Sequence, residues 1–309
     1  MEDPRKNQDS AGGLAFAVSA YFLWGLLPLY LKLLQDVPPL ELLAHRIVWS
    51  VPVAAGLLIV LRRGSDLLVA VRNPRTLAMA VLTAALVGTN WGVYVWAITS
   101  GQALDAALGY YINPLFSVFL GWLLLGERLK PVQFAAVGLA AVAVVILTVA
   151  AGSLPWIAIV LTFSWGFYAF FKKALPIGPN QGFLLEVLIL LPIALIYLGK
   201  VARSGNSSFA LDSMTGWLLL GTGLITAVPL ILYANGAKGL RLSTIGILQY
   251  IVPTMIFLIA VFVFDEPFTQ SRMIAFPLIW AALALYTFSL LQGRRKPEVP
   301  GAPPGNRPA

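Results

Sequence analysis

The 309-residue chain is 59% hydrophobic and only 11% charged, and it carries a formal net charge of +8 with no cysteine. Soluble domains are about 25% charged, so this composition excludes an ordinary soluble protein and indicates that lipid is the solvent. Without cysteine the chain has neither disulfides nor thiolate metal sites. The basic residues are scattered at the ends of apolar segments. This distribution is typical of basic residues that orient a membrane protein in the bilayer, and it argues against a nucleic-acid partner.

A membrane-spanning helix needs about 20 apolar residues, because it rises about 1.5 Å per residue across a hydrocarbon core of about 30 Å. Ten apolar segments meet this requirement, namely residues 14–34, 43–61, 77–99, 104–125, 133–151, 154–174, 183–201, 216–237, 243–264 and 273–292. The first contains Trp24, Pro28 and Lys32 where a secretory signal would have a small-residue cleavage site. We therefore interpret it as a spanning helix.

The chain contains two copies of one unit, because aromatic, proline and acidic residues recur in the same order after a shift of about 140 residues. The recurring pairs are Trp24 and Trp165, Pro52 and Pro192, Tyr94 and Tyr233, Tyr111 and Tyr250, Pro114 and Pro253, and Glu127 and Glu266. The predicted domains are repeats at residues 13–151 and 152–292. They are flanked by an N-terminal segment, residues 1–12, and a Pro- and Gly-rich tail, residues 293–309, that is predicted to be disordered.

Each copy holds an odd number of spans, so the second copy enters the bilayer from the opposite side and the repeats are inverted. Basic residues concentrate in the connections on the side of the two termini, which the positive-inside rule places in the cytoplasm. The predicted fold is an all-α integral membrane protein with ten transmembrane helices in two inverted five-helix repeats and both termini cytoplasmic.

Inverted repeats with interrupted helices are typical of secondary transporters, whose substrate site lies near the midplane where the halves meet. Prolines at related positions would kink the helices, because each lacks a backbone donor. We interpret as gating kinks Pro52, Pro114, Pro192 and Pro253. The alternative is that proline is simply frequent in membrane helices.

Polar and aromatic side chains inside the apolar segments are the candidates for a substrate cavity. A polar group in hydrocarbon costs several kcal/mol without a partner, so most of them should point inward. The candidates are Trp24, Asn90, Trp91, Tyr94, Tyr111, Asn113, Trp165, Tyr168, Tyr233, Gln249 and Tyr250. For each of them, a contact that only holds helices together is the alternative.

Three ionisable residues lie a turn or so inside predicted spans: His45, Arg46 and Glu186. Such groups usually mark a proton or substrate pathway or an ion pair, although Arg46 is long enough to extend to the headgroups. We hypothesise a role in coupling for them and expect no direct bond between His45 and Glu186, which lie near opposite faces. Glu127 and Glu266, at helix ends, are predicted to contact basic residues or backbone donors in a structural role.

Motifs for nucleotide or metal chemistry are absent from the sequence. Lys200 is followed by Val201 instead of Ser or Thr, which excludes a phosphate-binding loop, and a single histidine without cysteine excludes a zinc-type cluster. We predict no catalytic residue, no metal and no cofactor. An intramembrane enzyme, the alternative from another class, would have to use His45 with Asp36 or Glu41.

Short motifs in both halves carry a family resemblance. They are Trp24-Gly25, Ala44-His45-Arg46, Asn90-Trp91, Leu108-Gly109-Tyr110, Asn113-Pro114-Leu115, Gly126-Glu127-Arg128, Leu248-Gln249-Tyr250 and Glu266-Pro267. Together they resemble the RarD-like branch of the EamA, or drug/metabolite transporter, superfamily over about residues 12–292. The resemblance implies ten helices in inverted repeats, a central cavity lined mainly by the first four helices of each half, and export of aromatic and other neutral amino acids.

The sequence therefore predicts a bacterial inner-membrane secondary transporter that exports small metabolites, with neutral or aromatic amino acids as the expected substrates. A midplane rich in Trp, Tyr, Asn and Gln suits a neutral zwitterion, whereas a phosphate would need inward Lys or Arg. The alternatives are a permease for drugs or other metabolites and a non-transporting membrane sensor. The expected partners are the small-molecule substrate and the lipid bilayer. A monomer is expected, although Ala135, Gly138 and Ala141 could pack within the chain or against a second copy.

Overall fold

The computed structural model describes residues 10–62, 67, 70–125, 130–237, 239–240 and 242–292. Within these residues the chain forms α-helices and no β-strand. The helices are α1 (Ala11–Lys32), α2 (Pro39–Val60), α4 (Pro74–Thr99), α5 (Ala103–Leu125), α6 (Pro131–Ala151), α7 (Trp156–Ala174), α8 (Pro179–Arg203), α9 (Met214–Ala237), α10 (Leu242–Leu248), α11 (Ile251–Phe262) and α12 (Gln270–Gln292). The predicted tail at residues 293–309, most of the N-terminal segment and Glu127 lie outside the described residues.

Proline begins four of the helices. The first helical position is occupied by Pro39 in α2, Pro74 in α4, Pro131 in α6 and Pro179 in α8. A proline there loses no helical hydrogen bond, and its fixed φ already suits the helix. These helices begin a few residues before the predicted apolar segments, because a helix can extend into polar sequence that the apolar pattern does not count.

Eight helices in the described part of the chain are long and apolar enough to cross a membrane, and α7 and α11 contribute shorter apolar stretches, Trp156–Lys172 and Ile251–Phe262. Large apolar side chains cover the outside of the bundle: Ile59, Ile193 and Phe262 are each at least 70% exposed. Such a surface would promote aggregation in water, but it is the surface that a bilayer requires. The chain is a multi-pass integral membrane protein.

The segment predicted as one span at residues 243–264 is divided between α10 and α11 by a turn at Gln249 and Tyr250. In a regular helix the carbonyl of Gln249 would face Pro253, which has no N–H to donate. The turn is closed instead by the backbone N–H of Tyr250, which donates to the carbonyl of Ile247 (3.2 Å). The corresponding segment of the first half, α5, is one continuous helix.

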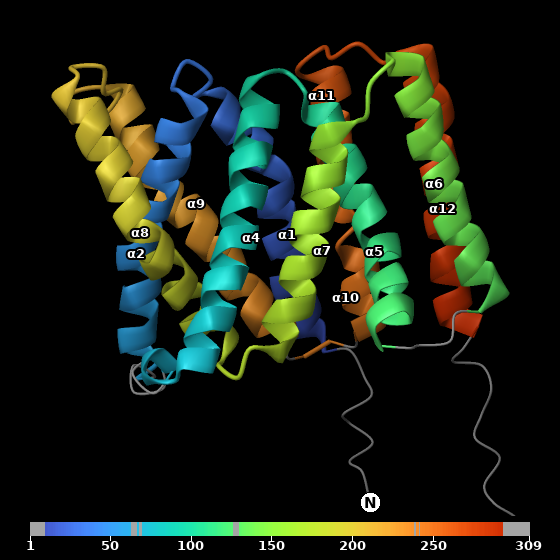
Figure 1. The fold of residues 1–309 in the computed structure, drawn as a ribbon, viewed down its shortest axis with the longest axis horizontal. Coiled ribbons are helices and arrows are strands. Elements are labelled where there is room, and N and C mark those ends of the chain that lie inside the picture. Colours follow the sequence, from blue (N-terminus) through green and yellow to red (C-terminus); the bar gives the residue numbers. More distant parts are fainter. Residues whose placement is uncertain are drawn as a thin grey trace, which may run out of the picture.

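The helices stand side by side in an elongated bundle, and the chain enters it from the lower end in Figure 1. α6 and α12 pack together on one side of the bundle, and α2 packs with α8 and α9 on the other. Between them, α1 packs against α9 and α11, while α7 packs against α4 and α5. A shift of about 140 residues along the sequence turns α1 into α7, α4 into α9 and α5 into α11. The contacts of α1 with α9 and α11 therefore correspond to those of α7 with α4 and α5.

α5 and α7 approach each other closely at Gly109. A Cβ atom at this position would lie 2.9 Å from the carbonyl oxygen of Ala158 on α7. The Thr162 hydroxyl of α7 donates to the carbonyl oxygen of Gly109 (3.0 Å). Small residues at membrane helix contacts allow this kind of backbone approach, so α5 is held firmly against α7 just before Pro114.

Candidate functional site

Arg46 of α2 is a buried charge, with 3% of its surface exposed. Its Nε donates a hydrogen bond to Thr226 Oγ1 on α9 (2.9 Å), and its Cζ lies 4.8 Å from the ring centroid of Trp91 on α4. Nη1 has no hydrogen-bond partner, and the ion pairs found among the described residues do not include Arg46. A full positive charge is therefore enclosed by an aromatic ring and a hydroxyl group.

Asn90 of α4 connects three helices. Its Nδ2 donates to Ser164 Oγ (3.0 Å) and to the carbonyl oxygen of Leu161 (3.2 Å), both on α7. Its Oδ1 accepts from the hydroxyl of Tyr110 on α5 (3.0 Å). Asn90 is fully buried, so this network fixes its amide and orients the Tyr110 ring between α4 and α7.

Aromatic rings surround these two polar residues. The ring of Tyr110 lies 5.7 Å from Tyr94 and 6.4 Å from Trp165, and both contacts are edge to face, a favourable arrangement for aromatic rings. The hydroxyl of Tyr94 is buried and has no hydrogen-bond partner. We refer to the residues Arg46, Asn90, Trp91, Tyr94, Tyr110 and Trp165 as the central cluster.

A second aromatic group lies between α1 and α9. Trp24 and Tyr233 lie 5.7 Å apart, and Tyr21 is 5.8 Å from each of them. Trp24 and Tyr233 are the repeat counterparts of Trp165 and Tyr94. Each of the two aromatic groups thus contains a tryptophan from one half and a tyrosine from the other: Trp24 with Tyr233, and Trp165 with Tyr94.

Glu186 of α8 is fully buried and has two partners on α7. Its Oε1 accepts from Lys172 Nζ (2.7 Å), and its Oε2 accepts from the hydroxyl of Tyr168 (3.2 Å). The Tyr168 ring also lies 5.4 Å from Trp165 of the central cluster. Glu186 and Arg46 therefore differ, because the carboxylate has an ion-pair partner and the guanidinium has none among the described residues.

His45 lies at the end of the bundle opposite the N-terminus. Its Nδ1 accepts from Trp49 Nε1 (3.2 Å), and its ring stacks on Phe209 at 5.0 Å. Phe209 belongs to the connection between α8 and α9, which Glu41 holds against α2 by accepting from the backbone N–H (2.7 Å) and hydroxyl (2.9 Å) of Ser208. His45 thus packs under a connecting segment at this end.

Tyr111 and Tyr250 meet at a different place. Tyr111 lies on α5 next to Tyr110 but contacts Phe276 and Trp280 of α12, and its hydroxyl bonds to Thr254 Oγ1 (2.9 Å). The pocket at this contact has a volume of about 360 Å³ and is lined by Tyr111, Tyr250, Thr254, Phe257, Leu258, Trp280 and Leu283. The two tyrosines therefore share a lateral pocket of α5, α11 and α12, separate from the contacts of the central cluster.

The remaining predicted residues are distributed along the helices. Asn113 is buried on α5 near Gly166 of α7, and neither atom of its amide group has a hydrogen-bond partner. Gln249 lies in the turn between α10 and α11. The four predicted kink positions are Pro52 in α2, Pro114 in α5, Pro192 in α8 and Pro253 in α11.

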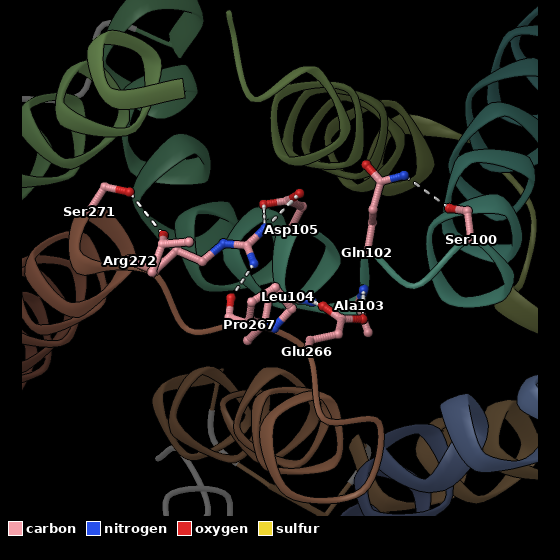
Figure 2. Close-up of polar contacts among 10 residues, drawn as sticks. Ser100, Gln102, Ala103, Leu104, Asp105, Glu266, Pro267, Ser271 and Arg272 are labelled. Atoms are coloured by element: carbon pink, nitrogen blue, oxygen red, sulfur yellow. Dashed lines mark hydrogen bonds and ion pairs between the residues drawn. The ribbon is translucent and has the colours of Figure 1, made fainter. Parts of the chain in front are cut away.

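Glu266 has the structural contact predicted for it, as Figure 2 shows. Its two carboxylate oxygens accept from the backbone N–H groups of Ala103 (2.6 Å) and Leu104 (2.9 Å) at the beginning of α5. Nearby, Arg272 of α12 forms an ion pair with Asp105 (3.1 Å). A carboxylate satisfies the free N–H groups of a first helical turn and interacts favourably with the helix dipole, so these contacts join α12 and the segment before it to α5.

The prediction missed several members of this network: Tyr110, Ser164, Thr226 and Lys172. Of these, Tyr110 could have been identified from the sequence, because it precedes Asn113 by one helical turn and belongs to the Leu108-Gly109-Tyr110 motif. Serine and threonine are common in membrane helices as contacts between helices, so no pattern in the sequence distinguishes Ser164 or Thr226. Lys172 lies near the end of its apolar segment, where a basic residue is expected in any membrane helix. Within the described ranges, no three His, Asp or Glu side chains come together as a metal-ligand group.

Comparison with known proteins identifies the family to which this chain belongs. The model of the EamA-like transporter family matches residues 11–149. An uncharacterized transporter of Vibrio cholerae is 43% identical over 281 residues, covering 91% of this chain and 93% of its own. Protein RarD of Escherichia coli is 39% identical over 285 residues, covering 92% and 96%.

One solved crystal structure superposes with a TM-score of 0.59 at 20% sequence identity, covering 92% of this chain and 99% of that chain. At this identity the likeness concerns the fold alone. The relatives named as transporters support a transport role instead of an enzymatic one. The chain is a membrane transporter of the EamA-like family and belongs to its RarD-like branch.

Proposed function

We propose that this protein exports small metabolites, specifically neutral or aromatic amino acids, across the bacterial inner membrane by alternating access. The observation that carries the proposal is the central cluster, in which polar and aromatic residues of both halves meet inside the bundle. Arg46 bonds to Thr226, and Asn90 bonds to Ser164, so a residue of the first half contacts the second in each case. Transporters with two related halves place their substrate site at this kind of junction.

The proposed architecture has ten membrane crossings, with α10 and α11 together forming one, in inverted repeats at residues 13–151 and 152–292. The matching helix contacts of the two halves support this arrangement: α1 packs against α9 and α11, as α7 packs against the corresponding helices α4 and α5. The excess of basic residues on the side of the termini supports a cytoplasmic location for both. A pseudo-twofold pair of halves would give outward-open and inward-open states of similar energy.

In this proposal the substrate contacts the central cluster and the aromatic group of Trp24 and Tyr233. Tyr168 lies beside Trp165 and extends the aromatic surface toward Glu186. Asn113 and Gln249 are assigned to the neighbouring part of the path, and Tyr111 and Tyr250 to a second substrate contact in the lateral pocket of α5, α11 and α12. The aromatic surfaces suit an apolar side chain, and the amide and hydroxyl groups suit the polar end of an amino acid.

The contacts at the end of the bundle opposite the N-terminus close that end. The carboxylate of Glu41 holds the connection between α8 and α9 over α2, and Arg272 and Asp105 link α12 to α5 (Figure 2). Alternating access requires these contacts to break when that end opens. The proposed kinks at Pro52, Pro114, Pro192 and Pro253 would allow the helix ends to move without separating the middle of the bundle.

Flux measurements on purified protein in liposomes test the proposal. We expect saturable uptake and efflux of a labelled neutral amino acid, competed by other neutral amino acids and weakened by Trp24→Ala or Trp165→Ala. Acceleration by a pH gradient, abolished by His45→Gln or Glu186→Gln in folded protein, would assign coupling to those residues. Absence of flux for every amino acid tested, with transport of another metabolite in the same liposomes, would overturn the amino-acid assignment.

A further inference from the structure

We propose that Arg46 and Tyr94 form a subsite for the carboxylate group of the transported molecule, so that the transporter selects substrates that carry a single carboxylate. The inference rests on the proposed function, because it assigns the polar end of the same substrate. It adds a restriction that the proposed function does not contain: amines, amides and cationic drugs of the same shape would lack the group that this subsite binds.

The first argument is the uncompensated charge of Arg46. A buried ion is stable when a counter-ion or several hydrogen bonds replace its hydration. In the part of the chain that the structure describes, Arg46 donates one hydrogen bond, to Thr226, and packs on one aromatic ring, Trp91, while its Nη1 has no partner. A bound carboxylate would supply both the missing charge and the missing acceptor.

The second argument is the free hydroxyl of Tyr94. Tyr94 is 4% exposed, and its hydroxyl has no hydrogen-bond partner. Tyr94 follows Trp91, the ring that packs on the Arg46 guanidinium, by one turn on the same side of α4, and its own ring lies 5.7 Å from that of Tyr110. The Tyr110 hydroxyl is already engaged by Asn90, so Tyr94 is the neighbour that can donate to an anion held by Arg46.

The third argument is that Lys172, a partly buried cation on α7, already has its anion. Lys172 forms an ion pair with Glu186 at 2.7 Å. Among the described residues, Arg46 is therefore the buried cation that a substrate carboxylate would meet without an ion-pair partner. One guanidinium neutralises one carboxylate, and its planar N–H pairs match the two carboxylate oxygens, whereas a phosphate dianion would retain an excess of negative charge in a region of low dielectric.

Two aromatic rings pack one after the other beside Arg46. Trp91 lies against the guanidinium, and Phe183 of α8 packs edge-on against Trp91 at 6.2 Å. Beyond Phe183 is a small cavity of about 10 Å³, also lined by Asn180, whose Oδ1 is buried without a partner. A substrate arriving from the side of this cavity would reach Arg46 by displacing Phe183.

The test is a set of binding titrations with matched ligands on the full-length protein in lipid nanodiscs. The probes are L-phenylalanine, L-phenylalaninamide, phenethylamine, and three carboxylates without an amino group: 3-phenylpropionate, 4-methylpentanoate and benzoate. We expect L-phenylalanine and at least one simple carboxylate to bind, and the amide and amine to bind at least about tenfold more weakly, because a hydrogen-bonded charge pair is lost. Binding of the amide as tight as that of the acid would overturn the proposal.

Two substitutions locate the subsite. We expect Arg46→Gln to weaken carboxylate binding at least about tenfold, and Tyr94→Phe to weaken it about fivefold, since the latter removes one hydrogen bond. Arg46→Lys keeps the charge but not the planar pair of donors, so it should retain part of the binding. Tyr94→Phe removes a hydroxyl without a partner and therefore keeps the proposal testable even if Arg46→Gln fails to fold.

The matched controls are Arg203→Gln, at the exposed end of α8, and Tyr197→Phe on the same helix, which should leave every titration unchanged. Carboxylate binding that is lost in the Arg46 and Tyr94 variants, without amino-acid flux in liposomes, would preserve the subsite and overturn amino-acid export. Amino-acid flux with equal use of the amides and no effect of either variant would preserve export and overturn the subsite. Failure of all three carboxylates and L-phenylalanine to bind at their highest soluble concentrations would also overturn it.

Discussion

Arg46 on α2 and Glu186 on α8 are both buried charged residues, yet their surroundings differ. Glu186 accepts from Lys172 and Tyr168, whereas Arg46 bonds to Thr226 and packs on an aromatic ring without an ion-pair partner among the described residues. Depth in the bundle therefore does not by itself define the role of a charge. A charge that is neutralised inside the protein holds helices together, and one that is not neutralised is available to a ligand.

This distinction has measurable consequences for stability. Removing one member of a buried ion pair leaves the other member uncompensated, which costs about 3–5 kcal/mol. Removing a buried charge that has no counter-ion leaves no partner behind and eliminates a desolvation cost. Neutral substitution should therefore destabilise the protein strongly for a paired buried charge and change its stability little for an unpaired one.

The largest expected effect follows Glu186→Gln, which leaves Lys172 without its anion. Lys172 retains 19% side-chain exposure, so we expect the lower part of the range, a loss of about 3 kcal/mol in the free energy of unfolding. Unfolding by SDS titration in mixed micelles measures it. Adding Lys172→Met to the variant should recover most of the loss, and equal stability of the single variant and the parent protein would contradict the ion-pair role.

Glu266→Gln should have the next largest effect. The carboxylate accepts from the backbone N–H groups of Ala103 and Leu104 (Figure 2), and a neutral amide offers one acceptor in place of two charged ones. We expect a loss of about 2 kcal/mol in the same SDS titration. Gln102→Ala, at the same end of α5 with only an exposed bond to Ser100, is the control and should change little.

A smaller effect is expected for Tyr110→Phe, which removes a neutral hydrogen bond to Asn90 and leaves the ring in place. Hydrogen bonds between membrane helices contribute about 0.6 kcal/mol on average, so the unfolding free energy should fall by about that amount. Because Asn90 loses its contact with α5, substrate affinity should fall as well. A drop of several kcal/mol would show instead that the hydroxyl is essential for the packing of α5.

The smallest effect on stability is expected for Arg46→Gln. The variant loses the bond to Thr226 and the contact with Trp91 but no longer desolvates an uncompensated charge, so the unfolding free energy should change by less than about 1 kcal/mol in either direction. Its defect should appear in carboxylate binding instead. A loss comparable to that of Glu186→Gln would reveal a counter-ion for Arg46 and would remove the contrast between the two charges.

Most of the helices could be predicted from the sequence, because a bilayer requires every spanning backbone to satisfy its own hydrogen bonds. The division of the segment at residues 243–264 could not. Pro114 and Pro253 lie at related positions, yet α5 continues past the first while α10 ends before the second. The difference lies in the packing: Gly109 lets α5 lie against α7 with its carbonyl bonded to Thr162, whereas the second half has the larger Leu248 at the related position.

The types of residue in the candidate site could be predicted from the sequence, but which of them lie together in the structure could not. Tyr110 and Tyr111 are adjacent in sequence, so a helix must direct them to different sides. The sequence pattern selected Tyr111, which lines the lateral pocket, while Tyr110 bonds to Asn90 in the central cluster. Which side of α5 meets α4 and α7 depends on helix packing, and no local pattern contains that information.

The amino-acid sequence was sufficient to identify lipid as the solvent of this protein and to locate its apolar helices, because hydrophobicity is a property of residues along the chain. The relation between its two halves stays a prediction from the recurring residues. Only the tertiary structure decided which buried charges are paired. An ion pair depends on the distance between side chains on separate helices, and Lys172 reaches Glu186 while no described carboxylate reaches Arg46. That distance distinguishes a carboxylate that joins α8 to α7 from a guanidinium that lacks an ion-pair partner within the described residues.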